Sequence, residues 1–131
     1  MEHPHRNELL VFVVNTEPDF LTTMRMLLED EGYAACTMRL IDDPFPEIAR
    51  TEPDLLMIDF PYREEAAWQL LDRLGTHPAT CAIPVIASST DPENLVGIPA
   101  RAGNRRTAAV VLKPLDLDHL LALVRSMLAV V

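Results

Sequence analysis

The chain has 131 residues, of which 49% are hydrophobic and 24% are charged, and its formal net charge is -9. This length and balance suit a single globular domain over residues 1–131, with a flexible start at 1–7 and no separate output domain. The acidic charge argues against nucleic-acid binding, which needs basic patches, and no apolar run approaches the roughly 20 residues that span a membrane.

Five short apolar runs lie along the chain and predict five β-strands. Apart from the second, each run is close to continuously apolar, which is typical of strands buried on both faces of a parallel sheet. The runs cover residues 9–14, 33–36, 55–58, 83–87 and 108–112.

Segments with an apolar period near 3.6 residues lie between these runs and predict amphipathic helices. Thr16 suits the N-cap of the first helix and Gly32 suits its end. Strand and helix therefore alternate five times, which predicts a doubly wound α/β domain with a parallel sheet between two helix layers. The clear helical patterns cover residues 18–31, 64–74 and 116–129, and weaker ones cover 46–51 and the segment from 92 onward.

Polar residues follow the predicted strands at the carboxyl ends, which is where ligands bind in folds of this kind. Asn-Thr-Glu at 15–17 follows the first strand, Asp59 the third and Lys113 the fifth, while the fourth ends in Ser-Ser-Thr at 88–90. The carboxyl ends of parallel strands meet at one edge of the sheet. We therefore expect the carboxylate of Asp59 and the ammonium of Lys113 to lie together.

Four motifs, in chain order, resemble those of the response-regulator receiver domain of two-component signalling. The separation of 30 positions between Asp59 and Ser89 also agrees with that family. The resemblance covers nearly the whole chain and implies a flavodoxin-like sheet in the order 2-1-3-4-5 with about five helices. The motifs are VVNTEPD at 13–19, PDLLMID at 53–59, IPVI at 83–86 followed by Ser89, and LKP at 112–114.

The resemblance also implies a function, which is phosphorelay signal transduction. Asp59 would accept a phosphoryl group from a histidine kinase or a phosphotransfer protein, with self-phosphorylation and self-dephosphorylation as the only enzymatic steps. Lys113 would balance the charge of the phosphate, and the hydroxyl of Ser89 would bind a phosphoryl oxygen when the switch closes. Mg²⁺ would be held by the residues after the first strand, by Asp59 and by the backbone carbonyl of Pro61.

The chain departs from the family at this metal site, because Asn15 and Thr16 replace its pair of acids. Neutral oxygens bind Mg²⁺ less strongly than carboxylates, so we expect a weak, degenerate site. Glu17 could reach in as a substitute, and Asn15 is equally open to interpretation as a turn residue. Val110 stands where the family has Tyr or Phe. The expected metal ligands are Asn15, Thr16, Glu17, Asp59 and Pro61.

These departures leave a second interpretation open, a pseudo-receiver that binds proteins without phosphate. A flavin-binding protein is disfavoured, because no glycine-rich loop follows the first strand. We expect a cytoplasmic protein with an unknown downstream protein partner and no nucleic-acid or membrane partner. Leu123 and Met127 widen the apolar stripe of the last helix, which fits either a homodimer through the fourth helix, fifth strand and fifth helix, or a larger core contact.

Overall fold

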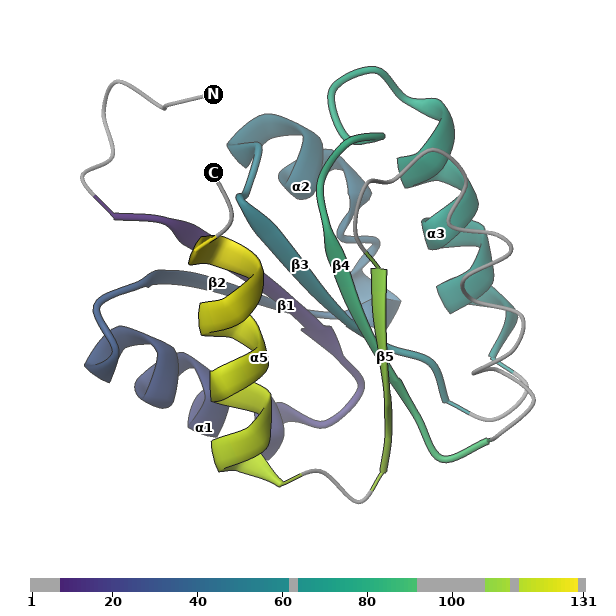
Figure 1. The fold of residues 1–131 in the computed structure, drawn as a ribbon. Helices are drawn as coiled ribbons and strands as arrows, with labels where there is room; N and C mark the ends of the chain where they lie inside the picture. Colours follow the sequence, from purple (N-terminus) through teal and green to yellow (C-terminus); the bar gives the residue numbers. More distant parts are fainter. Residues whose placement is uncertain (1–7, 62–63, 92–107, 114–115, 130–131) are drawn as a thin grey trace.

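A computed structural model of the chain describes residues 8–61, 64–91, 108–113 and 116–129 (Figure 1). Its centre is a five-stranded sheet in the order β2-β1-β3-β4-β5, in which all neighbouring strands are parallel. The predicted strand order is therefore confirmed. The strands are β1 (Leu10–Asn15), β2 (Ala34–Arg39), β3 (Leu55–Asp59), β4 (Val85–Ser89) and β5 (Ala108–Leu112).

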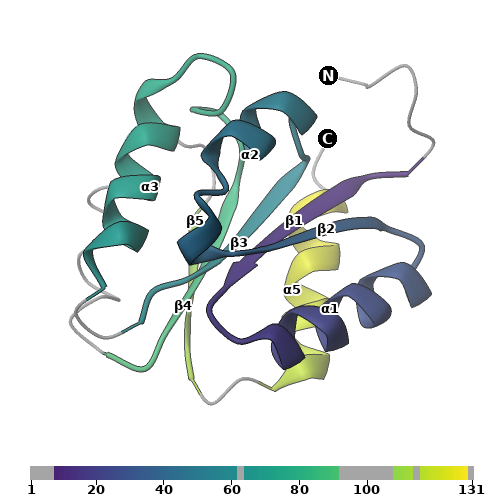
Figure 2. The same cartoon turned by 180° about the vertical axis from the view of Figure 1, so that it is seen from behind.

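Helices cover both faces of this sheet, α1 and α5 on one side and α2 and α3 on the other (Figures 1 and 2). The helix expected from residue 92 onward and the flexible start expected at 1–7 lie outside the described residues. None of the helices in the described ranges has the length and apolar character needed to cross a bilayer. The helices are α1 (Pro18–Asp30), the 3-10 turn η1 (Leu40–Asp42), α2 (Phe45–Thr51), α3 (Glu65–Thr76) and α5 (Leu117–Ala129).

Two hydrophobic clusters hold the three layers together, one on each face of the sheet. Successive side chains of a strand point to opposite faces, so β1 sends Phe12 into the α2/α3 cluster and Val13 into the α1/α5 cluster. Burial of each such side chain stabilises the fold by about 1.5–3 kcal/mol. Burial on both faces explains why the strand runs are continuously apolar rather than alternating.

The widened stripe of α5 contributes to the second of these clusters. Leu123 and Met127 are partly buried and pack against the α1/α5 cluster within the same chain. This contact supports the interpretation of the stripe as a larger core contact. The dimer face also expected for this helix includes the segment from residue 92, which lies outside the described residues.

The ends of α1 show how the local sequence shapes the fold next to the candidate site. Pro18 occupies the first turn and Glu17 is the N-cap residue, although no side chain caps the helix. The prediction that Thr16 is the N-cap is wrong, because the helix begins one residue later than that interpretation requires. At the other end Gly32 adopts a φ of 93°, the left-handed conformation that glycine accepts without strain.

A pair of hydrogen bonds ties β1 to β3 at the amino ends of the strands. The backbone N–H of Leu10 donates to Oδ2 of Asp54 at 2.7 Å, and the N–H of Asp54 donates to the carbonyl of Leu10 at 2.8 Å. Asp54 directly precedes β3 in the sequence, so this reciprocal contact holds the register of the two central strands. It lies at the edge of the sheet opposite Asp59.

Candidate functional site

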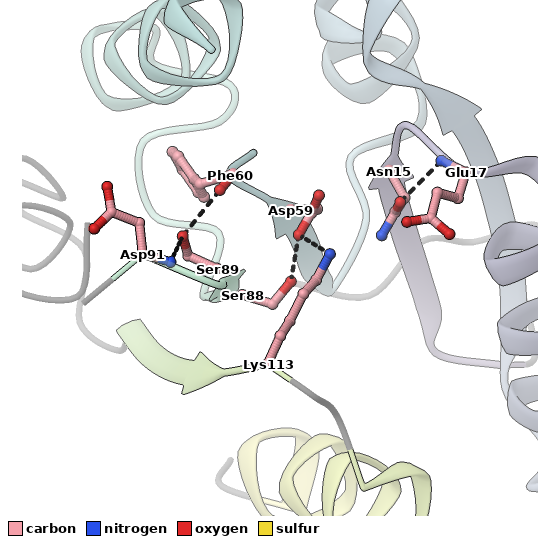
Figure 3. A network of polar contacts seen from close by, with 8 residues as sticks. All are labelled: Asn15, Glu17, Asp59, Phe60, Ser88, Ser89, Asp91 and Lys113. Atoms are coloured by element: carbon pink, nitrogen blue, oxygen red, sulfur yellow. Dashed lines mark hydrogen bonds and ion pairs between the residues drawn. The ribbon is translucent and has the colours of Figure 1, made fainter. Parts of the chain in front are cut away.

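The carboxyl ends of β3, β4 and β5 bring a carboxylate, a hydroxyl and an ammonium together (Figure 3). Asp59 is the last residue of β3, and Lys113 directly follows β5. The Nζ atom of Lys113 lies 2.6 Å from Oδ1 of Asp59, and their side chains are 21% and 3% exposed. The expected meeting of these two residues at one rim of the sheet is therefore confirmed.

Ser88 supplies the hydroxyl of this group, and the sequence motifs marked Ser89 rather than this residue. The register of the sheet pairs Ser88 with Asp59, and the serine Oγ donates to Oδ1 of Asp59 at 3.2 Å. Oδ1 thus forms an ion pair with the ammonium of Lys113 and accepts a hydrogen bond from this hydroxyl. Within the described part of the chain, no group donates a hydrogen bond to Oδ2.

Ser89, the hydroxyl expected at the site, points the other way. Its side chain is completely buried, donates to the carbonyl of Phe60 at 3.0 Å and accepts from the N–H of Asp91 at 3.0 Å. Figure 3 shows this side chain directed toward Phe60 and Asp91 and away from Asp59. The opposite directions of Ser88 and Ser89 follow from the alternation of side chains along β4.

Asn15 ends β1 next to this group and is buried, and its side chain has a local partner. Its Oδ1 accepts a hydrogen bond from the backbone N–H of Glu17 at 3.0 Å, which is an Asx turn leading into α1. Of the two interpretations left open for Asn15, the turn residue is the one that the structure supports. Thr16 and Glu17 are both exposed.

A magnesium site is an octahedron of oxygen ligands, commonly one or two carboxylates together with waters and phosphate oxygens. Here Asp59 is the one buried carboxylate among the described residues of this edge, and its Oδ1 already binds the Lys113 ammonium. The Oδ1 atom of Asn15 is used by the Asx turn, and the carbonyl of Pro61 accepts the N–H of Glu64 at 3.2 Å. No three His, Cys, Asp or Glu side chains of the described segments cluster closely enough to hold a metal ion. The described residues of this edge, with their one buried carboxylate already paired, do not fit Mg²⁺.

The two opposite charges of the site pair with each other. Asp59 carries the one buried negative charge among the described residues of this edge, and the Lys113 ammonium lies 2.6 Å from its Oδ1. A buried carboxylate is tolerated only when it is paired and hydrogen-bonded, and both conditions are met by the ammonium and by Ser88. Val110 packs against the α2/α3 cluster behind this group. The arrangement can present a carboxylate oxygen to an electrophile beside a fixed cation.

Comparisons with known proteins show which of them share sequence or fold with this chain. No family model matches the chain. A 49-residue segment is 41% identical to the nitrogen assimilation regulatory protein NtrX of Azorhizobium caulinodans, and this match spans 37% of the chain and 11% of that protein. The chain therefore covers only a small part of the length of this relative.

Solved structures resemble the chain over almost its whole length. A two-component response regulator from Clostridium difficile has a TM-score of 0.79 at 16% identity, with 94% of this chain and 98% of that one covered. The receiver domain of a histidine kinase from Syntrophus aciditrophicus has a TM-score of 0.76 at 23% identity, with 92% and 89% covered. The N-terminal domain of a response regulator receiver protein from Methanoculleus marisnigri has a TM-score of 0.65 at 25% identity, with 92% and 96% covered.

Proposed function

We propose that this chain, which has the fold of response-regulator receiver domains, is a receiver module of a two-component phosphorelay with Asp59 as its phosphoacceptor. The observation that carries the proposal is the ammonium of Lys113, 2.6 Å from the Asp59 carboxylate at the carboxyl edge of the sheet. In open parallel sheets this edge is where ligands bind. A fixed cation beside a nucleophilic carboxylate is what phosphoryl transfer to an aspartate requires.

The chemistry assigned to Asp59 is nucleophilic attack on phosphorus. One carboxylate oxygen forms the new O–P bond while the bond from phosphorus to the donor's leaving atom breaks, and the leaving group keeps the electron pair. Oδ2 is the oxygen assigned to this attack, because Oδ1 is held by the ion pair with Lys113 and by the hydrogen bond from Ser88. The ammonium of Lys113 then offsets the negative charge that gathers on the phosphoryl oxygens.

The proposal includes the partners of the module. A histidine kinase or a phosphotransfer protein donates the phosphoryl group, and a separate downstream protein recognises the phosphorylated form. Chemistry by the chain itself is limited to its own phosphorylation and dephosphorylation at Asp59. A cytoplasmic location is part of the proposal, because ATP supplies the phosphoryl groups of such relays there.

Intact mass measurement tests the proposal directly. The protein is incubated with acetyl phosphate, with and without millimolar Mg²⁺, and the expected result is the gain of one phosphoryl group that hydroxylamine removes. Asp59→Asn should abolish the gain. Asp72→Asn, which changes an exposed aspartate on α3, is the matched control and should leave it intact. A gain that persists in Asp59→Asn would show that another residue is the acceptor.

A second candidate function, a pseudo-receiver that binds proteins without phosphate, is favoured by one observation. The positions that would carry the metal-binding acids hold Asn15, whose side-chain oxygen is used by a backbone turn, and the exposed Thr16. Under this alternative neither acetyl phosphate nor beryllofluoride changes the protein. Asp59→Asn would then bind the downstream protein as well as the wild type does.

A further inference from the structure

We propose that Ser88 is a positioning residue for the phosphoacceptor, and that it takes this role at the site in place of Ser89. The inference rests on the proposed function and assigns a role to a residue that the motifs do not mark. The hydroxyl of Ser88 donates to Oδ1 of Asp59 at 3.2 Å, and the two residues are register partners on neighbouring strands. Both side chains are buried.

The hydrogen bond from Ser88 fixes the orientation of the carboxylate. A lysine ammonium alone can follow a carboxylate as it rotates, because its stem is flexible and its three donors are interchangeable. Ser88 sits on a rigid strand and has a short side chain, so its donor holds one carboxylate oxygen in a defined place. With Oδ1 held by Ser88 and Lys113, the Oδ2 of Asp59 is directed away from both donors and is presented for attack.

Backbone hydrogen bonds keep Ser88 and Ser89 from exchanging these roles. The N–H of Phe60 donates to the carbonyl of Ser88 at 2.8 Å, and the N–H of Lys113 donates to the carbonyl of Ser89 at 2.8 Å. A slip of one residue would be needed to turn Ser89 toward Asp59, and it would reverse every side chain of β4. The hydroxyl of Ser89 meanwhile joins the ends of β3 and β4 through Phe60 and Asp91.

Three variants separate positioning from packing: Ser88→Ala, the conservative Ser88→Thr, and Ser89→Ala as the matched loss of a neighbouring hydroxyl. The first readout needs no phosphate and is the side-chain rotamer distribution of Asp59, measured from NMR couplings. We expect a single rotamer in the wild type and in Ser88→Thr and Ser89→Ala. We expect more than one rotamer in Ser88→Ala.

The second readout is the rate of phosphorylation of Asp59 by acetyl phosphate at 25 °C. Loss of one hydrogen bond to a charged group should slow Ser88→Ala by about tenfold. Ser88→Thr should stay near the wild-type rate. Ser89→Ala should lower the melting temperature instead, with a near-normal rate for the folded protein.

The rotamer and rate measurements test the role of Ser88 separately from the proposed function. Wild-type protein that takes no phosphoryl group contradicts the proposed function, while the rotamer measurement still decides whether Ser88 orients Asp59. Wild-type protein that is phosphorylated, with an unchanged rate and a single Asp59 rotamer in Ser88→Ala, overturns the role of Ser88. Equal impairment of Ser88→Ala and Ser88→Thr would also overturn it, because a packing defect explains that result.

Discussion

The ammonium of Lys113 lies 2.6 Å from the carboxylate of Asp59, although the two residues belong to strand ends that are not neighbours in the sheet. Strand β4 lies between β3 and β5, so the lysine reaches over one strand, a span of about 9.5 Å between the flanking strands. Its ammonium is the cation that balances an almost completely buried carboxylate. The stability of this edge therefore depends on the pair.

Replacing Lys113 with methionine tests that dependence, because methionine keeps an apolar stem and removes the charge. The variant should lower the free energy of unfolding by about 3 kcal/mol, since an unpaired buried carboxylate is left behind. Adding Asp59→Asn to Lys113→Met should recover most of the lost free energy of unfolding, because no unpaired charge remains. Urea unfolding of the four proteins of this cycle gives the coupling energy.

Arg25→Met provides the matched control for that cycle. The Arg25–Glu29 pair has a separation of 3.5 Å and side chains that are 55% and 52% exposed, so solvent screens it. Its loss should change the unfolding free energy by no more than about 0.5 kcal/mol. If Lys113→Met and Arg25→Met have equally small effects, the Asp59 charge does not depend on Lys113.

Magnesium binding should appear only when carboxylates replace Asn15 and Thr16. Isothermal calorimetry should detect no Mg²⁺ binding by the wild type at millimolar concentrations, and binding by Asn15→Asp/Thr16→Asp. Aspartate at position 15 keeps an oxygen for the N–H of Glu17, so the turn into α1 survives. Before Mg²⁺ is added, the double variant should be less stable, because its new carboxylates lie near Asp59.

A control for this experiment adds the same two charges elsewhere. Thr22→Asp/Thr23→Asp places them on the exposed face of α1 and should bind no Mg²⁺ under the same conditions. Binding of Mg²⁺ by the wild-type protein would contradict the interpretation that Asn15 and Asp59 are committed to contacts within the chain.

The hydrogen bond from the N–H of Leu10 to Asp54 predicts that removing the Asp54 side chain destabilises the start of β1 locally. Asp54→Ala removes the acceptor of a part-buried N–H and should cost about 1–3 kcal/mol. Asp54→Asn keeps a carbonyl oxygen and should cost less. Hydrogen exchange at the amide of Leu10 should accelerate in the alanine variant before exchange in the rest of β1, and uniform acceleration would contradict a local role.

The ion pair between Glu47 and Arg50 on α2 predicts a lowered pKa for the Glu47 carboxyl. Two hydrogen bonds from Arg50, of 2.8 and 2.6 Å, lower the pKa of Glu47 below its ordinary value of 4.5. A lowered pKa means that the pair stabilises the fold above the unfolded-state pKa and that this contribution is lost as the pH falls through the folded-state value. Side-chain carboxyl NMR should show the pKa of Glu47 returning toward 4.5 in Arg50→Gln. An unchanged titration would rule out Arg50 as the cause.

Much of the architecture could be predicted because strand burial leaves a strong signal in sequence. Continuously apolar runs marked four of the five strands and a shorter run marked β2, and alternation with helices gave a parallel sheet. The meeting of Asp59 with Lys113 followed from topology, since parallel strands bring their carboxyl ends to one edge. Neither conclusion depended on the exact end of any element.

Details that depend on one residue of register could not be predicted. The resemblance to a known family implied Ser89 as the hydroxyl at the site, whereas the register of β4 turns Ser88 toward Asp59. The predicted start of β4 was two residues early, because the N–H of Ile83 bonds to Thr80 in a turn. Strand β2 runs further than its apolar run because it is an edge strand and tolerates polar residues such as Arg39.

The reciprocal hydrogen bonds between Leu10 and Asp54 affect which substitutions the fold can accept during evolution. These hydrogen bonds join β1 and β3 at their amino ends. They therefore help to hold the register of the two strands independently of the polar residues at the carboxyl ends. Substitutions at the carboxyl edge that keep the Asp59–Lys113 pair can therefore be accepted while β1 and β3 keep their register. Such tolerance gives a physical route by which a sheet of this topology can keep its shape while the residues at its carboxyl edge change.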